Sequence, residues 1–230
     1  MTTRLLLESL AAPVAYAVLV AQLRQIPPKQ LRPLIRLRRG HDVVLAVYSG
    51  VVTVIMVAKL VHNDRLRAMH DLVCVSSPGE PALWLESKVL EWFDTALLFA
   101  AGRFPSTLHL VHHAITPSLV LVSVAQRANP SPVYDLAVGL NAWCHLWQYL
   151  YYAWPKPLRA LKVHVTRMQV AQHATVLSCI GLALYYRQRD GPEACDVPLV
   201  PYGLSLLGYA FFLFAFTRFY WREYVAKKRS

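Results

Sequence analysis

Charged residues are scarce in this chain: Asp, Glu, Lys and Arg make up 16% of its 230 residues, whereas hydrophobic residues make up 56%. Soluble globular domains carry about 25% charged residues, so this composition excludes an ordinary soluble domain and favours an integral membrane protein. The sequence also lacks internal repeats and low-complexity tracts. Hydrophilic stretches between its apolar segments are no longer than about twenty residues, which is too short for a separate soluble domain.

Seven apolar segments account for the hydrophobic residues, and each approaches the roughly 20 residues that an α-helix needs to cross a bilayer. Four contain long uncharged stretches, whereas Glu8 interrupts the first segment and Lys59 lies near the end of the second, where it can reach the interface. A six-helix alternative stays open, because Arg4 and Ala15-Tyr16-Ala17 also resemble the flank and cleavage site of a signal peptide. We predict an all-α fold: a single polytopic membrane domain, a bundle of seven transmembrane helices at residues 5–23, 43–61, 81–102, 104–126, 135–154, 167–186 and 197–218.

Acidic residues are few, with 13 Asp and Glu against 24 Lys and Arg and a formal net charge of +11. If the seven helices alternate in direction, 16 Lys and Arg fall on the side of the C-terminus and 6 on the other side. The positive-inside rule then places the N-terminus in the lumen and the C-terminus in the cytosol. The charge needs no nucleic acid partner, since such loops contact anionic lipid headgroups and suit a phosphate-bearing substrate.

Cysteine is rare as well, with four residues in the chain. Cys144 and Cys179 lie inside predicted helices, whereas Cys74 and Cys195 fall in two loops on the predicted lumenal side. Oxidation is allowed in that compartment. We therefore predict a disulfide between Cys74 and Cys195.

A histidine triplet stands at the start of the fourth predicted helix, in the stretch His109-Leu-Val-His112-His113. Residues at i, i+3 and i+4 fall within a narrow arc of one helix face. Polar side chains at membrane depth are costly, so this face must be directed at a protein interior or a wet cavity. The triplet is therefore the first candidate for a functional site.

The third predicted helix carries charges that a transmembrane segment tolerates only with partners. Lys88, Glu91, Asp94 and Thr95 share one face, and each charge costs about 2.5 to 3.5 kcal/mol at mid-bilayer. Lys88 and Glu91 can pair at i, i+3. We expect the remaining carboxylate to find its partner on the histidine face.

Two more predicted helices carry polar stripes. Single Asn or Gln residues in transmembrane helices often form interhelical hydrogen bonds, and tyrosines near helix ends often form an aromatic belt at the membrane interface. A structural role of this kind stays open for individual residues of the two stripes. Four polar stripes in four consecutive helices, however, indicate one shared cavity open to the cytosol. The stripes of the fifth and sixth helices are Asn141, His145, Gln148, Tyr149 and Tyr152, and Thr166, Gln169, Gln172 and His173.

Together these residues form a set of ordered motifs. The set resembles the signature motifs of the ELO family, the very-long-chain fatty acid elongases of the endoplasmic reticulum. The chain differs in having Gln148 where that family usually has Met, and it is short for the family. The motifs are Lys88-x-x-Glu91-x-x-Asp94-Thr95, His109-x-x-His112-His113, Asn141-x-x-x-His145-x-x-x-Tyr149-x-Tyr151-Tyr152 and Thr166-x-x-Gln169-x-x-Gln172.

The resemblance implies a 3-oxoacyl-CoA synthase that condenses an acyl-CoA with malonyl-CoA and needs no metal or cofactor. It assigns His112 as the acyl-accepting nucleophile and His145 as its partner, while His109 and His113 orient or polarise. A carboxylate, Asp94 or Glu91, would fix an imidazole tautomer. The residues expected to bind or orient substrate are Lys88, Glu91, Asp94, Thr95, Asn141, Gln148, Tyr149, Tyr152, Thr166, Gln169, Gln172 and His173. Expected partners are acyl-CoA, malonyl-CoA and membrane lipids; further copies of the chain and other elongation enzymes stay open.

Two other function classes compete with this interpretation. Membrane di-iron desaturases and hydroxylases share the HxxHH pattern, but they need about eight histidines in several boxes. Here there is one box, and His41, His62, His70 and His164 lie apart from it in the sequence. A seven-helix receptor or transporter fits the topology but leaves the histidine triplet unexplained.

Lys227 and Lys228 stand fourth and third from the end of the sequence. Their placement resembles the di-lysine retrieval signal of endoplasmic-reticulum membrane proteins, although a basic tail also follows from positive-inside topology. We therefore expect an endoplasmic-reticulum membrane protein.

Overall fold

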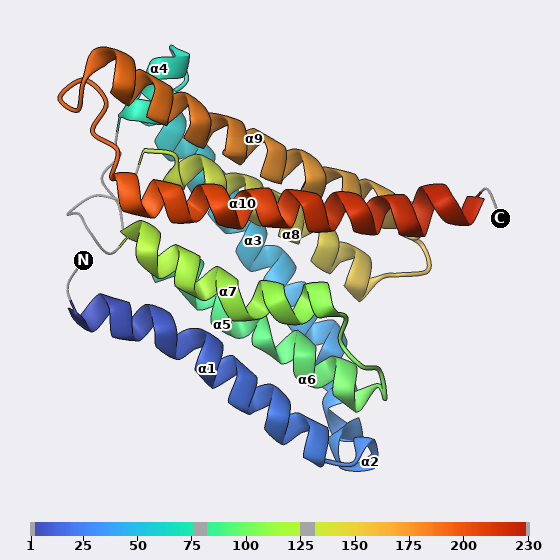
Figure 1. The fold of residues 1–230 in the computed structure, drawn as a ribbon. Helices are drawn as coiled ribbons and strands as arrows, with labels where there is room; N and C mark the ends of the chain where they lie inside the picture. The colour runs from blue at the N-terminus through green and yellow to red at the C-terminus, as the bar shows by residue number, and fades with distance from the viewer. Residues whose placement is uncertain (1–2, 76–81, 125–131, 229–230) are drawn as a thin grey trace.

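A computed structural model describes residues 3–75, 82–124 and 132–228 of the chain. These residues form helices and short connections, and they contain no β-strand. Figure 1 shows the long helices lying side by side in one bundle. The elements are α1 (Thr3–Gln25), α2 (Pro28–Leu31), η1 (Arg32–Leu37), α3 (Arg38–His62), α4 (Met69–Cys74), α5 (Ala82–Leu90), α6 (Trp92–Ala100), α7 (Thr107–Val124), α8 (Tyr134–Ala153), α9 (Leu161–Asp190), α10 (Leu199–Tyr220), η2 (Trp221–Val225) and η3 (Ala226–Lys228).

The all-α prediction is confirmed for the described residues, and each predicted segment overlaps helical residues; residues 81, 125 and 126 of the predicted segments lie outside the described residues. By length and composition, two helical stretches in the described part of the chain can cross a membrane, Pro28–His62 and Leu199–Val225. The seven-span count and its orientation stay predictions. The third segment differs from expectation, because it bends at Glu91 into α5 and α6 instead of forming a single helix. At the bend, the Asp94 N–H donates to the Glu91 carbonyl over only three residues, 3.1 Å apart, a tighter turn than an α-helix makes.

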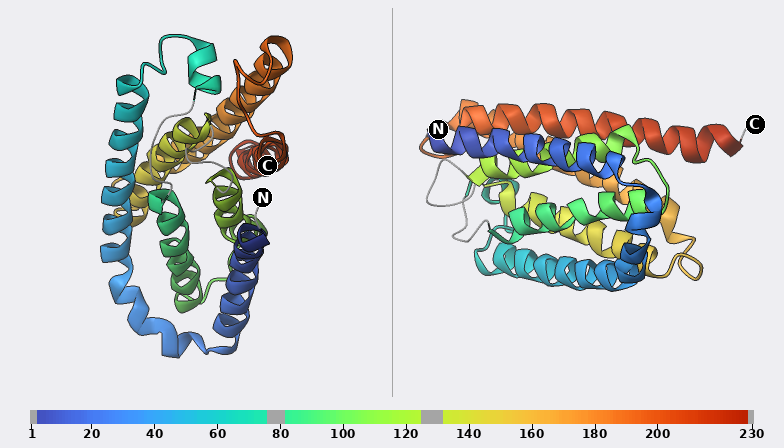
Figure 2. Two further views of the ribbon diagram at one scale, coloured as in Figure 1. Left: turned by 90° about the vertical axis from the view of Figure 1, so that its left-hand side faces the viewer. Right: turned by 90° about the horizontal axis from the view of Figure 1, so that it is seen from below.

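The long helices alternate in direction, and the described ends of the chain lie at opposite ends of the bundle (Figures 1 and 2). Helix α2, the α6–α7 and α8–α9 connections and the last helical turns share one end. Helix α4 and the α9–α10 connection lie at the other. The count of Lys and Arg on the two sides assumed this alternation. The connections rich in Lys and Arg therefore lie at one end of the bundle.

Helix α3 packs along α8 at close range. Gly139 permits this approach, because a Cβ placed there would lie only 3.2 Å from the Cβ of Met56. Further along the same contact, Leu45 and Ala46 pack against the buried Tyr149 ring. The contact sets the register between the two helices, and it brings the first turns of α3 beside the last turns of α8.

The end of the bundle near α4 is held by buried polar contacts as well as by apolar packing. Lys59 donates to the buried Asp135 carboxylate (2.8 Å), so its ammonium forms an ion pair with a residue of α8. The guanidinium of Arg65 is 1% exposed and donates to the carbonyls of Asp71, Leu72 and Pro132. Burial lowers the pKa of Arg65, and the nearby Asp135 carboxylate opposes that shift.

The Cys74 and Cys195 sulfurs form a disulfide that joins the end of α4 to the loop after α9, with the Cα atoms 4.6 Å apart. This is the pairing that the loop positions predict. Both half-cystines are buried in a cluster that also contains Val73, Val176 and Val197. Cys144 and Cys179 are free and buried.

Loss of this disulfide should destabilise the protein substantially. Closing a loop across a sequence separation of 121 residues contributes roughly 4 to 5 kcal/mol in the chain-entropy description. Cys74→Ser and Cys195→Ser should each lower the unfolding free energy by up to about this amount, measured by denaturant unfolding in detergent. The double variant should cost little more than either single one. Strictly additive losses, or four free thiols in the unreduced denatured protein, would contradict the pairing.

Candidate active site

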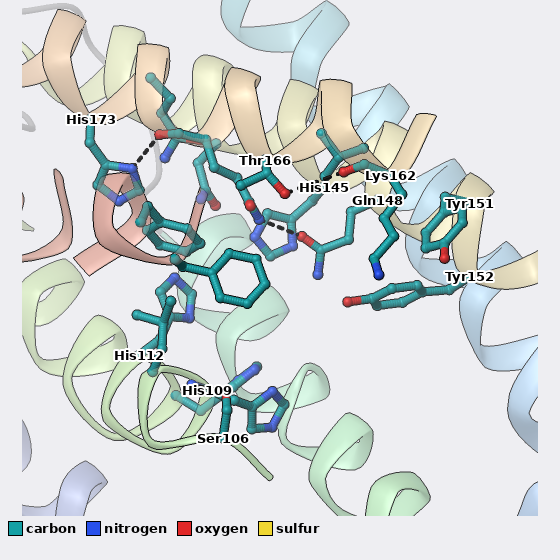
Figure 3. A pocket seen from close by; sticks show the side chains of 18 of the residues that line it. Ser106, His109, His112, His145, Gln148, Tyr151, Tyr152, Lys162, Thr166 and His173 are labelled. Carbon is teal, nitrogen blue, oxygen red and sulfur yellow. Dashed lines mark hydrogen bonds between the residues drawn. The ribbon is translucent and has the colours of Figure 1, made fainter. Parts of the chain in front are cut away.

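A cavity of about 240 Å³ opens between α7, α8, α9 and α10. Figure 3 shows side chains from these helices turned toward the same space. Most of the lining residues are polar, which is unusual for the interior of an apolar bundle. They are Ser106, Leu108, His109, His112, His113, Asn141, His145, Gln148, Tyr151, Tyr152, Lys162, Val165, Thr166, Gln169, Gln172, His173, Phe216, Phe219 and Tyr224.

Helix α7 contributes the histidine triplet, and local sequence explains how its first turn is held. Ser106 precedes the helix, and its hydroxyl accepts from the His109 backbone N–H (3.2 Å), as a helix N-cap does. Pro117 has no N–H, so it leaves the His113 carbonyl without its helical partner. The Trp92 indole donates to that carbonyl (3.0 Å). The bond ties α6 to the histidine turn of α7.

The three imidazoles have different surroundings. His109 is 2.9 Å from the Thr95 hydroxyl through its Nε2, and its ring lies 4.2 Å from that of His113. His113 is buried, and no group in the described residues bonds its Nδ1. His112 faces the cavity beside the rings of Phe212 and Phe216. Its imidazole has no hydrogen-bond partner among the residues that the structure describes.

Helices α8 and α9 form the facing wall. Gln169 donates to Gln148 across the helix pair (2.8 Å), and His173 is bonded through Nδ1 to the Gln169 carbonyl. Figure 3 shows His145 and Gln148 on the side of the cavity opposite His112. Gln148 therefore acts as a hydrogen-bonded part of the wall.

A buried ion pair lies behind His145. Lys88 is 1% exposed and donates both to the Glu91 carboxylate (2.7 Å) and to the side-chain amide oxygen of Asn141 (2.9 Å). The same Glu91 oxygen is 3.3 Å from Nδ1 of His145. The Lys88–Glu91 pair is the one that the i, i+3 spacing predicts, and Lys88 also fixes which way the Asn141 amide faces. Neither charged residue lines the cavity; they support groups that do.

Asp94 and Thr95 lie in a second network at the back of α6. Asp94 accepts from Tyr149 (2.7 Å) and from His41 (2.9 Å), and the Thr95 hydroxyl is 2.8 Å from that of Tyr16. The expectation that this carboxylate would meet the histidine triplet is wrong, because its imidazole partner comes from α3. His41 had been set apart from the site by its distance in the sequence. Tyr16 carried no signal, since it stands alone in an apolar helix.

Sequence reasoning thus found most of the polar lining but missed part of the cavity. His109, His112, His113, Asn141, His145, Gln148, Tyr152, Thr166, Gln169, Gln172 and His173 line it as expected, whereas Lys88, Glu91, Asp94, Thr95 and Tyr149 lie outside the lining. The lining residues that were not proposed as site residues are Ser106, Leu108, Tyr151, Lys162, Val165, Phe216, Phe219 and Tyr224. Most of the missed residues lie near helix ends or on α10, where no polar stripe marks them.

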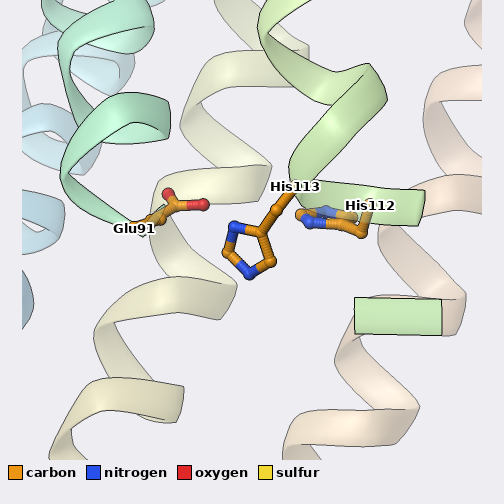
Figure 4. Close-up of side chains that lie close together, drawn as sticks. All are labelled: Glu91, His112 and His113. Carbon is orange, nitrogen blue, oxygen red and sulfur yellow. The ribbon is translucent and has the colours of Figure 1, made fainter. Parts of the chain in front are cut away.

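Two groups of potential metal ligands occur in the described residues: Glu91, His112 and His113, shown in Figure 4, and His41, Asp42 and Asp94. In the first group, the Glu91 carboxylate already holds the Lys88 ammonium, so a cation would be repelled at short range. In the second, His41 bonds Asp94 directly, and Arg38 lies 3.7 Å from Asp42. Neither donor set suits the multi-histidine ligation of a di-iron centre.

Comparison with known proteins places this site in a family. The chain is 28% identical over 151 residues to fatty acid elongase 2 of Trypanosoma brucei brucei, covering 62% of this chain and 55% of that protein. It is 30% identical over 171 residues to putative fatty acid elongase 1 of Schizosaccharomyces pombe (69% and 49%), and 29% identical over 157 residues to very long chain fatty acid elongase 7 of Drosophila melanogaster (61% and 43%). The matched region spans about half the length of these relatives. The family model described as ELO, GNS1/SUR4 family, matches residues 7–230, and the chain therefore belongs to the ELO family.

Proposed function

We propose that this protein is a membrane-embedded condensing enzyme of fatty acid elongation, which joins an acyl-CoA with malonyl-CoA to give 3-oxoacyl-CoA, CO2 and CoA. Family membership and the names of the relatives support the elongation pathway. The cavity supports the reaction type, because histidines from three helices, α7, α8 and α9, face one space. The proposed setting is the endoplasmic-reticulum membrane, with the basic end of the bundle in the cytosol.

The observation that carries the proposal is the position of His112. Its imidazole lies in the cavity beside apolar rings, and no protein group in the described residues bonds its nitrogens. A neutral imidazole nitrogen can attack a thioester carbonyl, forming a carbon–nitrogen bond while the carbon–sulfur bond breaks. CoA leaves with the proton, and the acyl group stays on His112. One difficult transfer is thereby divided into two easier steps.

The second half-reaction uses malonyl-CoA. Loss of CO2 leaves an enolate whose carbon attacks the acyl-imidazole carbonyl. A carbon–carbon bond forms, the carbon–nitrogen bond to His112 breaks, and the leaving imidazole takes up one proton from solvent. The enolate oxygen needs preorganised donors in a site with little water. The Asn141 amide, which Lys88 orients, and the His145 imidazole stand on the wall facing His112. Both are therefore assigned to this step.

Lys162 gives the cavity a cationic mouth. Lys162 is the second residue of α9, and its side chain lines the cavity. The α8–α9 connection directly before it lies at the same end of the bundle as the α6–α7 loop. The ammonium is suited to the phosphates of CoA. The proposed orientation turns this mouth to the cytosol and the disulfide to the lumen, where oxidation is favoured.

Replacing Lys162 should weaken CoA binding and leave the chemistry intact. A hydrogen bond to a charged group contributes about 1.5 to 3 kcal/mol, so Lys162→Ala should raise KM for the CoA substrates roughly tenfold or more, with kcat little changed. Steady-state kinetics on purified protein measure both constants. Lys156→Ala, in the neighbouring loop and outside the cavity lining, is the matched control. An equal rise in KM in the control would show a general charge effect.

The function itself is tested with purified protein in liposomes. Incubation with a series of acyl-CoA substrates and carboxyl-labelled malonyl-CoA should yield labelled CO2 and 3-oxoacyl-CoA in equal amounts. Mass spectrometry of the products also detects the competing outcome, a desaturated or hydroxylated acyl chain of unchanged length. Failure to form 3-oxoacyl-CoA from any chain length by a folded protein would overturn the proposal.

A further inference from the structure

The mechanism makes no use of His41, although it lies in a well-ordered polar cluster behind the cavity. His41 stands near the start of α3, and its Nε2 is 2.9 Å from one oxygen of Asp94. The other Asp94 oxygen accepts from the Tyr149 hydroxyl at 2.7 Å. Three helices, α3, α6 and α8, thus meet at a single carboxylate.

The chemistry of this carboxylate determines the role of its neighbours. An ionised carboxylate only accepts hydrogen bonds, so His41 must present an N–H and Tyr149 its O–H. The two donors bind different oxygens, and together they fix the rotation of the Asp94 side chain. The exposed fractions of the His41 and Asp94 side chains are 13% and 12%, so water competes little for these bonds. Removing His41 would leave one oxygen of Asp94 without its donor.

Tyr149 connects this cluster to the cavity. It is 1% exposed and follows His145 by one helical turn, and the two rings lie 5.7 Å apart. On its other side, His145 has Glu91 3.3 Å from its Nδ1. The His145 imidazole therefore lies between the Tyr149 ring and the Glu91 carboxylate, and its Nδ1 makes no hydrogen bond within the described residues. Movement of Tyr149 would open space beside His145 and let it leave that position.

We propose that His41 is a positioning residue of the active site: by holding Asp94 it fixes the Tyr149 hydroxyl, and the Tyr149 ring keeps His145 aimed into the cavity. This role rests on the proposed function insofar as His145 serves the condensation. The geometric part concerns the place and reactivity of His145 and stands independently of the reaction catalysed.

His41 also packs against rings, at 5.0 Å from Phe93 and 6.2 Å from Tyr149, so simple packing is the alternative explanation. Two variants separate the two roles. His41→Phe keeps an aromatic ring and loses the donor, whereas His41→Gln loses the ring and keeps an N–H that can reach Asp94. A positioning role predicts that His41→Phe is impaired and His41→Gln is close to wild type. A packing role predicts the reverse.

The first experiment measures condensation kinetics. His41→Phe should lower kcat about tenfold with KM changed less than twofold, and His41→Gln should stay within about threefold of wild-type kcat. In a Tyr149→Phe background the loss caused by His41→Phe should largely disappear, because the chain from Asp94 to the hydroxyl is already broken. Full additivity of the two substitutions, or equal kcat in wild type and His41→Phe, would overturn the proposal.

The second experiment does not depend on activity. Diethyl pyrocarbonate modifies accessible imidazoles, and peptide mass spectrometry gives the rate for each histidine. His41→Phe should raise the rate at His145 several-fold, with His173 of the same cavity as internal reference, and His41→Gln should not. An unchanged His145 rate overturns the positioning role. An inactive wild-type protein in which His145 responds as expected overturns only the proposed function.

Discussion

Replacing His112 with Ala should abolish malonyl-CoA-dependent elongation while leaving the protein folded. Its imidazole makes no hydrogen bond to the described residues and touches apolar rings, so its loss removes chemistry and little structure. Loss of the group that accepts the acyl chain should cost roughly 10³-fold or more in kcat. His145→Ala should be as severe, because it removes the partner on the facing wall. Retained elongation in either variant would contradict its assignment.

A mass measurement can separate the two histidines. Incubation of the wild-type protein with acyl-CoA alone should leave an acyl group on the peptide that contains His112, and His112→Ala should abolish this adduct. His164→Ala is the matched control, because His164 lies exposed on the first turns of α9 and does not line the cavity. Full activity in the control shows that the losses belong to the site and not to histidine replacement in general.

Removing Lys88 should cause a large loss of stability. Lys88→Ala removes the donor to the buried Glu91 carboxylate and to the side-chain oxygen of Asn141, and it takes away the cation that compensates the Glu91 charge. Stranding one partner of a buried ion pair costs about 3 to 5 kcal/mol. The measurement is denaturant or thermal unfolding of the protein in detergent, with elongation assayed in parallel. A Lys88→Ala protein as stable as wild type would show that the Glu91 charge is compensated by other groups.

Two controls give this experiment its meaning. Arg67 and Asp64 form an ion pair of similar length, 2.9 Å, but their side chains are 73% and 57% exposed. Arg67→Ala should therefore cost less than about 1 kcal/mol. In the buried pair, Lys88→Met combined with Glu91→Gln removes both charges. This double variant should be more stable than Lys88→Met alone, because no uncompensated charge stays buried.

The local patterns predicted much of the site correctly. The spacing of His109, His112 and His113 places them on one helix face, and the structure turns that face toward a cavity. The i, i+3 spacing also identified the Lys88–Glu91 pair. Both inferences concern residues within one turn of a helix, and helical geometry alone relates such residues.

Partnerships between helices were predicted less well. The spacing of residues within α6 could not show that Asp94 would meet His41. That contact depends on the position of α3 along α8, whose Tyr149 also bonds Asp94. The close approach at Gly139 and the packing of Leu45 and Ala46 against Tyr149 set that register. The bend at Glu91 carried no proline or glycine signal, and it arises where α5 and α6 meet two different neighbouring helices.

By itself, the sequence determined the helical character of the chain, the segments that form its helices, the polar faces and the identity of the catalytic candidates. Composition and periodicity are local properties, and they survive whatever the helices pack against. Only the tertiary structure decided which faces meet, that Lys88 and Asp94 lie outside the lining of the cavity, and that the exposed Lys162 is part of it. These outcomes depend on the register and crossing of helices far apart in the chain, which side-chain packing sets and no spacing along one helix records.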